Sequence, residues 1–281
     1  MSCVALRFFP VRRNVRGMMR RCFVPFPLAL LLMLTAHSAA AAPPAAVNAA
    51  FDDYVRLLEA RIAAQHSSTR NFLAPATLRP TPSQASPCIE RIAVTGLPGA
   101  LLHHWRATQF IPNARAADLD RLLRNFDDYP TLFAPQVERA NGTPSSPGHV
   151  HLGMRLRQRH VLTVVLDAEY DVSFANLDSQ HRYSISRSTH IHEIDSPGTS
   201  AEHALPPDWE HGFLWRQNTY WSYQEIDGGL LIQVESLSLT RSIPIGIGWA
   251  VGPYVESIPR DSLEFTLHRI SAALHPAKTA S

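Results

Sequence analysis

The stretch NARAADLDRLLRNFDDYP, residues Asn113–Pro130, places a helix early in a chain that is otherwise rich in strands. Asn113 is a residue type that caps the start of a helix. Pro130 and Pro135 interrupt the helical pattern, which predicts a broken second helix or a turn around Thr131–Phe133. The apolar residues recur at the spacing of one helix face, and they are Leu119, Leu122, Leu123 and Phe126.

Long strands are predicted after this helix. In Leu162–Phe174 every second residue is apolar and the others are mostly charged or hydroxyl-bearing, which indicates one covered and one solvated face. Asp227-Gly228-Gly229 predicts a tight hairpin turn. The other expected strands are an opening pair, Cys88–Val94 and Leu101–Ile111, and then His149–Arg159, Arg182–Ile194, Phe213–Ile226 and Leu230–Arg241.

A helix closes the pattern. Pro259–Leu274 carries its apolar residues along a single stripe and ends before His275-Pro276. Such a narrow stripe cannot fill the covered face of a sheet this wide. We therefore predict an α+β fold in which a curved antiparallel β-sheet wraps around a long C-terminal helix and leaves a hollow between them. The stripe consists of Leu263, Leu267, Ile270 and Leu274.

This order of elements resembles the START-like superfamily (helix-grip, SRPBCC-type), near its polyketide cyclase/dehydrase and lipid-transport members. The helix Ala116–Phe126 running into Asp127-Asp128-Tyr129-Pro130 is similar to the early helix-Asp-Tyr-Pro segment of that superfamily. Glu235–Leu239 and the terminal helix fit its last strand and its grip. The resemblance covers Glu90–Leu274, and it implies a helix-grip fold that binds lipids, polyketides or other apolar molecules between sheet and helix.

Residues 1–42 have the features of a signal peptide. Arg20-Arg21 precede the uncharged run Phe23–Ala36, and small residues follow, so cleavage is expected after Ala40 or Ala42. We therefore predict a periplasmic or secreted protein. A retained membrane anchor is the competing interpretation, although the apolar run is short for a bilayer span.

The rest of the chain divides into three parts. Residues 43–87 form an N-terminal helix and a Pro-rich linker, with the amphipathic helix expected at Val47–Gln65. Residues 88–276 form the START-like domain, and residues 277–281 form a tail. Cys88 is the only cysteine after residue 42, so no intrachain disulfide is expected.

Removal of the signal changes the net charge. The whole chain has 26 Lys and Arg against 24 Asp and Glu, a net +2, but residues 1–42 hold six arginines and no acid, which leaves 20 against 24, or −4. No nucleic-acid partner is expected, because such binding needs a basic excess on the folded domain. Lys278 is the only lysine, which excludes a phosphate-loop lysine or a Schiff-base lysine in the domain.

A ligand pocket needs apolar area and a few polar groups that orient the ligand. Under strict alternation Trp215, Thr219, Trp221 and Tyr223 share one face of the strand Phe213–Ile226. Ordinary core packing is the alternative interpretation. The candidate ligand-binding residues are Trp105, Arg187, Trp215, Thr219, Trp221, Tyr223 and Glu235.

Arg187 is expected to point into the hollow. Alternation places it on one face with Tyr183, Ile185 and Ile191. A buried guanidinium must be paired, so Glu235 or a ligand carboxylate is its expected partner, and a structural Arg–Glu pair is the favoured interpretation.

The histidine pairs and the basic stripe are interpreted as surface features. His149 with His151, and His190 with His192, lie on strand faces assigned to solvent, and no third ligand is evident, so no metal site is predicted. The stripe could meet anionic lipid headgroups, but pairing with the neighbouring strand is the simpler account. The stripe is Arg155, Arg157 and Arg159, and its expected partners are Asp167, Glu169 and Asp171.

The segment Ile243–Val255 is apolar, free of charge and rich in Gly and Pro. We expect a mobile lip over the hollow that makes transient membrane contact, with an ordinary buried approach to the last helix as the alternative.

No catalytic motif of the G-x-S-x-G, H-E-x-x-H or glycine-rich phosphate-loop type occurs. We therefore expect an exported protein that binds a small hydrophobic molecule or lipid without a cofactor; the oligomeric state is not predicted. Two alternatives stay open. One is a polyketide cyclase/dehydrase-type enzyme that uses Arg187, Glu235 and Tyr223 in the same hollow, and the other is a partner-binding envelope protein with a filled core.

Overall fold

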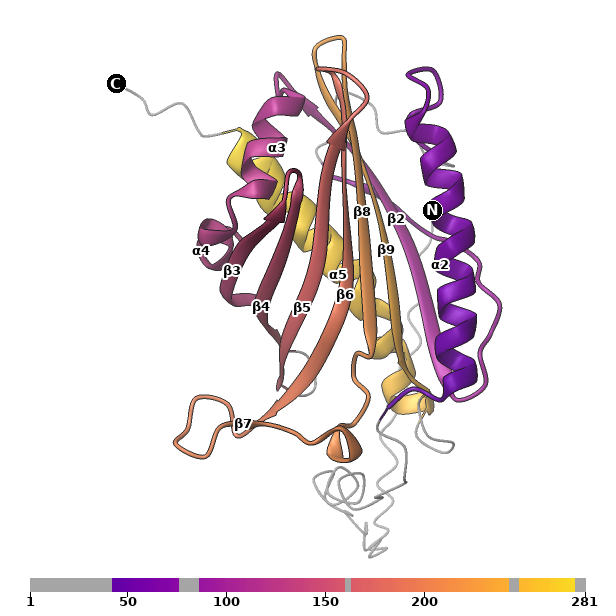
Figure 1. Cartoon of the computed structure of the whole chain (residues 1–281), viewed down its shortest axis with the longest axis vertical. Coiled ribbons are helices and arrows are strands. Elements are labelled where there is room, and N and C mark those ends of the chain that lie inside the picture. The colour runs from indigo at the N-terminus through magenta and orange to yellow at the C-terminus, as the bar shows by residue number, and fades with distance from the viewer. Residues whose placement is uncertain (1–41, 76–85, 160–162, 243–247, 276–281) are drawn as a thin grey trace, which may run out of the picture. The chain divides into compact units, whose positions relative to one another are not determined.

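The computed structural model describes residues 42–75, 86–159, 163–242 and 248–275, with backbone alone for residues 248–256. Within these residues nine strands form one sheet in the order β1-β2-β9-β8-β6-β5-β4-β3, with β7 paired to β6 (Figure 1). The predicted signal peptide and the tail lie outside the described residues. The strands are β1 (Cys88–Arg91), β2 (Ala100–Pro112), β3 (Val137–Ser146), β4 (His149–Arg159), β5 (Thr163–Asn176), β6 (His181–Asp195), β7 (His203–Ala204), β8 (Arg216–Ile226) and β9 (Gly229–Arg241).

Helices cover both faces of this sheet. The helix α5 (Gly248–Leu274) lies across the face that we call the inner face, together with α3 (Ala116–Arg124) and α4 (Tyr129–Leu132) (Figure 1). The helix α2 (Ala45–His66) lies on the opposite, outer face. All strand pairs are antiparallel, so the predicted α+β helix-grip architecture is confirmed.

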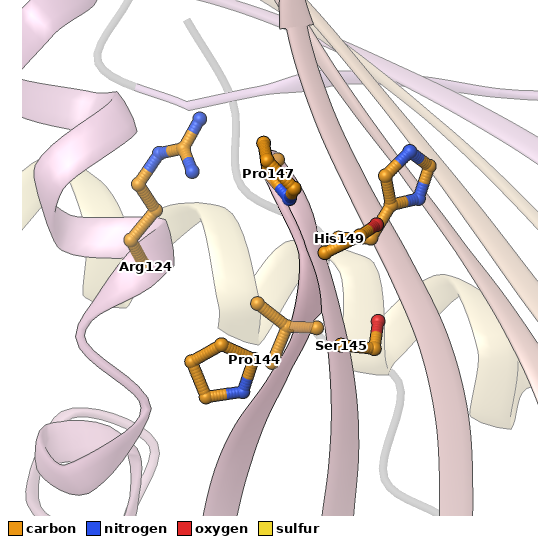
Figure 2. A pocket seen from close by; sticks show the side chains of 8 residues that line it. Arg124, Pro144, Ser145, Pro147 and His149 are labelled. Atoms are coloured by element: carbon orange, nitrogen blue, oxygen red, sulfur yellow. The ribbon is translucent and has the colours of Figure 1, made fainter.

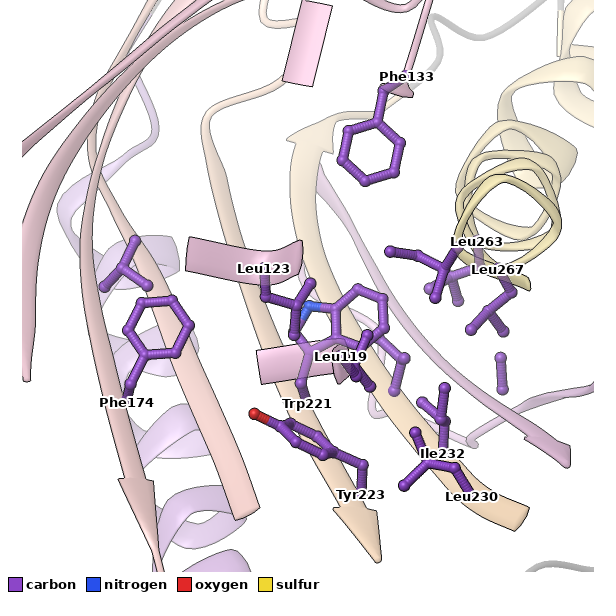
Figure 3. Packing of buried hydrophobic residues seen from close by; sticks show 14 of the residues in the cluster. Leu119, Leu123, Phe133, Phe174, Trp221, Tyr223, Leu230, Ile232, Leu263 and Leu267 are labelled. Carbon is purple, nitrogen blue, oxygen red and sulfur yellow. The ribbon is translucent and has the colours of Figure 1, made fainter. Parts of the chain in front are cut away.

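The larger apolar core lies on the inner face. Leu263 and Leu267 of α5 point toward Leu230 and Ile232 of β9, and Trp221 lies beside the leucines of α3 (Figure 3). Leu263 is 6% exposed and Leu267 is 0% exposed, so the stripe predicted from the sequence is the buried side of α5.

A second core lies on the outer face, beneath α2. The predicted helix at 47–65 is confirmed as α2, but the expected solvated outer face is wrong for the central strands. Leu102, Leu237 and Leu239 alternate with inner-face residues and pack under α2, so β9 is covered on both sides. The residues that α2 contributes to this core are Val47, Phe51, Leu58 and Ile62.

The predicted hairpin turn is confirmed between β8 and β9. Ile226 pairs with Gly229 across a two-residue turn, and Gly228 has φ +82°, a left-handed conformation that glycine adopts without strain.

The strand β3 was not predicted, because Asn141, Gly142 and Pro144 give it little strand propensity. Gly142 has a packing reason. A Cβ built on it would lie 2.3 Å from the ring of Phe126, so glycine lets that ring approach the strand.

The last helix begins at Gly248, not at Pro259 as predicted. The predicted lip is therefore wrong for Gly248–Val255, which forms the first turns of α5, and its remaining part, 243–247, lies outside the described residues. A proline inside a helix removes one backbone hydrogen bond without necessarily ending the helix, which is why Pro259 was a misleading start signal.

Candidate functional site

The inner face carries a line of polar side chains that crosses its central strands. Strand register pairs His103 with Ser238, and Ser238 with Gln217. On the other side of the line, Ser188 pairs with Tyr170, and the backbone N–H of Gln217 donates to Ser188 Oγ at 2.9 Å. The Tyr170 hydroxyl donates to Gln217 Oε1 at 3.0 Å. We call this set the polar row: His103, Ser238, Gln217, Ser188 and Tyr170.

A second row lies next to it on the same face. Trp105 pairs with Ser236 across β2 and β9, Ser236 pairs with Thr219 across β9 and β8, and Thr219 pairs with Ser186 across β8 and β6. The following positions along these strands, such as Ala107 and Val234, belong to the apolar core. The second row, Trp105, Ser236, Thr219 and Ser186, therefore separates the polar row from that core.

Part of this inner face keeps exposed surface although its strands are central. Gln217, Thr219 and Ser186 stand on strands with neighbours on both sides, yet they are only partly buried, as is Trp105. Apolar side chains of the same face are also partly buried: Met154, Leu156 and Ile191. An apolar surface with a few polar groups has the composition of a small-molecule site.

Two of the sequence candidates lie on the inner face but deeper in the core. Trp221 is 8% exposed and Tyr223 is 0% exposed. The Tyr223 hydroxyl donates to Asp120 Oδ1 of α3 at 2.8 Å, and burial together with Asp120 raises the pKa of Tyr223. Tyr223 therefore anchors α3 to the sheet and has no surface open to a ligand.

Glu235 lies on the outer face beneath α2, not in the hollow. It is 4% exposed and receives hydrogen bonds from Arg61 Nη2 at 2.8 and 2.7 Å. The His104 Nε2–Glu235 Oε2 distance is 2.8 Å, and Tyr54 Oη lies 2.8 Å from His104 Nδ1. Burial alone would raise the pKa of Glu235, but the hydrogen bonds from His104 and Arg61 lower it to about 2.

Arg187 also lies on the outer face, so the predicted Arg187–Glu235 pair is wrong. Its Nε donates to Glu59 Oε1 of α2 at 2.6 Å. The physical reason is a β-bulge in β6: Tyr170 pairs with Ser188, whereas Glu169 pairs with His190. The extra residue reverses the alternation, so that Ile191 faces inward and Arg187 outward.

Trp215 was predicted to share a face with Trp221, and this is wrong as well. The strand β8 begins only at Arg216, so alternation does not extend back to Trp215. Its side chain packs in the outer core with Phe51 and Tyr220.

The three residues predicted for the enzyme alternative do not lie together in one site. Arg187 and Glu235 belong to the outer face with separate partners, and Tyr223 lies on the inner face bonded to Asp120. The chain Tyr54–His104–Glu235 resembles a proton relay in its hydrogen bonding, but α2 covers it and Arg61 saturates the carboxylate.

A surface depression of about 490 Å³ lies between the end of α3 and the β3–β4 turn. Arg124 reaches from α3 toward the residues of that turn (Figure 2). Its guanidinium already bonds Asp120 Oδ2 at 2.8 Å and lies 4.1 Å from the ring centre of Phe174. Because the guanidinium of Arg124 is already engaged, this depression is a weaker candidate than the inner face.

The exposed outer face of β4–β6 is a network of ion pairs. Arg155 bonds Asp167 and Glu202, and Arg157 bonds Glu138, so the predicted pairing across strands is confirmed for Arg155. In the described part of the chain, no group of three or more His, Cys, Asp or Glu residues is arranged to hold a metal ion. No described helix is long and apolar enough to cross a bilayer.

No protein-family model matches the chain, and no curated protein sequence does. Several solved structures are similar to part of the chain. A STAR-related lipid transfer protein from Xanthomonas axonopodis is 16% identical, covering 67% of this chain and 96% of that chain, with a TM-score of 0.46. Human STARD10 is 11% identical, covering 70% and 72%, with a TM-score of 0.46. The Zhui aromatase/cyclase from Streptomyces sp. R1128 is 14% identical, covering 64% and 99%, with a TM-score of 0.41.

The fold is a helix grip. This statement rests on the antiparallel sheet and on the C-terminal helix packed across its inner face. These similarities carry no argument about function, so the function has to be argued from the side chains of this chain.

Trp105 and Thr219, two of the predicted ligand-binding residues, lie on the inner face. The polar row was not predicted from the sequence. No single strand reveals that row, since each strand contributes one or two polar residues to it. The available signal was the run of serines at Ser184, Ser186 and Ser188, which share a face by alternation. Recognising the row requires the register among five strands.

Proposed function

We propose that this chain binds a small hydrophobic molecule between the inner face of the sheet and α5. The observation that carries the proposal is the partly exposed polar surface on the covered side of the central strands. A face built only for stability would continue with side chains such as Ala107, Val234 and Trp221. Instead it changes to serines, a threonine and a glutamine, which cost stability when they are buried without partners.

We further propose that the protein works outside the cytoplasm. The support is the basic pair Arg20-Arg21, the short apolar run after it and the small residues up to Ala42. N-terminal sequencing of the protein recovered from the envelope or secreted fraction of its host tests this. A mature terminus at Ala41 or Pro43 supports export with cleavage, and an uncut chain in the cytosol contradicts it.

Binding can be tested with pyrene, an uncharged fluorescent hydrocarbon. We expect saturable binding, detected through the change in pyrene fluorescence. Thr219→Phe fills the middle of the inner face and should weaken binding about tenfold or more. Thr143→Phe is the matched control, because Thr143 is an exposed residue of β3, and it should bind pyrene as the unmodified protein does.

Native mass spectrometry of protein purified from its own host is the complementary measurement. A co-purifying apolar molecule that is lost in Thr219→Phe and kept in Thr143→Phe supports the proposal. Absence of pyrene binding, with a folded protein and no bound molecule, would contradict it and would favour a partner-binding protein with a filled core. No described arrangement favours an enzyme, because Arg187, Glu235 and Tyr223 lie apart.

A further inference from the structure

Two polar atoms on the inner face are buried with no hydrogen-bond partner among the described residues: Ser238 Oγ and Trp105 Nε1. Ser238 is 5% exposed. Its neighbours Leu237 and Leu239 pack under α2, so alternation directs Ser238 to the inner face. An unpaired buried hydroxyl or indole N–H is costly, which makes both atoms candidates for a ligand contact.

Strand register brings these two atoms to one place. Trp105 pairs with Ser236 and His103 pairs with Ser238, so Trp105 and Ser238 are diagonal neighbours on one face of the β2–β9 pair. Diagonal neighbours on a sheet lie within reach of a large aromatic side chain. An indole N–H can only donate, whereas a serine hydroxyl can donate or accept. Together they suit one oxygen atom with a lone pair, such as that of a carbonyl or a hydroxyl group.

Two carboxylates of this face are engaged elsewhere. Glu193 is 5% exposed and accepts hydrogen bonds from the backbone N–H groups of His211, Gly212 and Phe213. Asp120 is bonded to Tyr223 and to Arg124. These carboxylates hold a loop and a helix in place, so they are not available to a cationic ligand.

The polar row and the second row contain no arginine or lysine. They consist of His103, Trp105, Tyr170 and uncharged serine, threonine and glutamine residues. Arg91 of the same face pairs with Trp105 across β1 and β2, but it is exposed on the edge strand. A carboxylate or phosphate taken into this site would therefore have no buried cation beside it, and burial of an unpaired charge is costly.

We infer that the ligand is an uncharged apolar molecule with an oxygen acceptor that binds Trp105 Nε1–H and Ser238 Oγ. This inference rests on the proposed function and names its ligand class. Neutral alcohols, ketones and esters fit it, whereas free fatty acids and phosphorylated lipids do not.

The test compares 1-pyrenebutanol with 1-pyrenebutyrate at neutral pH, followed by pyrene fluorescence. The two probes share the ring system and the chain, and they differ in charge. We expect the alcohol to bind about tenfold more tightly or better, because the carboxylate loses its hydration without gaining a partner cation. Equal or tighter binding of the butyrate overturns the inference.

Two variants identify the atoms. Ser238→Ala and Trp105→Phe should each weaken pyrenebutanol binding by about three- to tenfold more than they weaken pyrene binding, the usual effect of one neutral hydrogen bond. Ser179→Ala and Trp209→Phe are the matched controls at exposed positions, and they should change neither affinity. Equal weakening of pyrene and of pyrenebutanol would assign Ser238 and Trp105 a packing role only, which contradicts the inference.

Binding of pyrene itself distinguishes a failure of the proposed function from a failure of the inferred ligand class. If pyrene does not bind to the folded protein, the proposed function fails and the inference fails with it. If pyrene binds but the alcohol has no advantage over the butyrate, the site exists and only the inferred ligand class is wrong.

Discussion

Glu235 receives hydrogen bonds from side chains of a helix and a strand while being 4% exposed. Arg61 comes from α2, and His104 comes from β2. Arg106 of β2 also lies near, with its Nη2 3.4 Å from Glu235 Oε2. A charge so deeply buried is stable only because these partners are in place. Its role is therefore to hold α2 against the outer face, and it is not part of the inner-face site.

We expect Glu235→Gln to lower the free energy of unfolding by about 3 kcal/mol at neutral pH, since it leaves Arg61 without its partner charge. Urea unfolding followed by circular dichroism measures this. Glu169→Gln, at an exposed ion pair on β5, is the control and should change stability by at most about 0.5 kcal/mol. Equal losses in the two variants would refute a special role for Glu235.

The same carboxylate predicts a loss of stability in acid. Its pKa is about 2 in the folded protein, below the usual value of about 4.3 for an unfolded chain. Its stabilising contribution is therefore complete above about pH 4.3 and is lost as the pH falls toward 2. Unfolding free energies measured across this range should fall less steeply in Glu235→Gln than in the unmodified protein, and parallel curves would argue against it.

His66 predicts a separate loss at higher pH. Burial and the nearby Arg61 lower the pKa of His66 to about 4, and its Nε2 lies 2.8 Å from Ser222 Oγ. The folded protein favours neutral His66, so stability should fall as the pH decreases from about 6.5 to about 4. His66→Phe keeps a ring stacked on Tyr183 and should flatten the stability curve in this range. His190→Phe, at an exposed site, should not.

At the scale of elements, α2 is an integral layer of the fold. The helix and the sheet belong to one compact unit, and Phe51 is 0% exposed in the core between them. The guanidinium of Arg216 lies 4.8 Å from the centre of the Phe51 ring and closes this core at one edge. The outer face of β9 would be exposed if α2 were absent.

We expect Phe51→Ala to cost about 3–5 kcal/mol of stability, the usual range for removal of a buried aromatic ring. Leu57→Ala is the matched control on the same helix, because Leu57 is 63% exposed, and it should cost at most about 0.5 kcal/mol. Thermal unfolding of both variants measures the two losses of stability. A Phe51→Ala protein as stable as Leu57→Ala would mean that α2 is not docked on the sheet in solution.

The bulge in β6 could not be predicted from the sequence of that strand. Arg187 and Ile191 are four residues apart, which strict alternation places on one face. One extra residue between the pairs Tyr170–Ser188 and Glu169–His190 sends them to opposite faces. Arg187 thereby meets Glu59 of α2, and the inner face loses the cation that it was expected to carry.

At the scale of the whole molecule, one sheet separates two cores that share strands but not side chains. Mutations in the two cores should therefore act independently. We expect Ile62→Val in α2 and Ile270→Val in α5 to cost about 0.5–1.5 kcal/mol each. Their sum should match the double variant within about 0.5 kcal/mol.

The control for this additivity test is a pair of variants at residues that contact each other directly. Tyr223→Phe and Asp120→Asn affect two groups joined by a hydrogen bond of 2.8 Å, so their effects should not add. Coupling between Ile62 and Ile270 as strong as that between Tyr223 and Asp120 would show that the two cores respond as one.

The sequence by itself determined most of the elements and the fold class. Period-two alternation, the Asp227-Gly228 turn and the stripe of Leu263 and Leu267 are local patterns, and local patterns report secondary structure and the buried side of a helix. They gave the helix-grip architecture, with Trp105 and Thr219 on its inner face. The signal peptide, the ligand and the roles of these residues remain predictions.

Only the tertiary structure decided on which face of the sheet each polar side chain lies. The place of α2 on the outer face, the bulge that turns Arg187 away and the register that aligns Ser238 beside Trp105 all depend on contacts between residues distant in sequence. A side chain's partner is set by the strand or helix opposite, which no local pattern encodes. For this reason charged residues expected in the hollow lie beneath α2, and the polar row and the second row contain no arginine, lysine or acid.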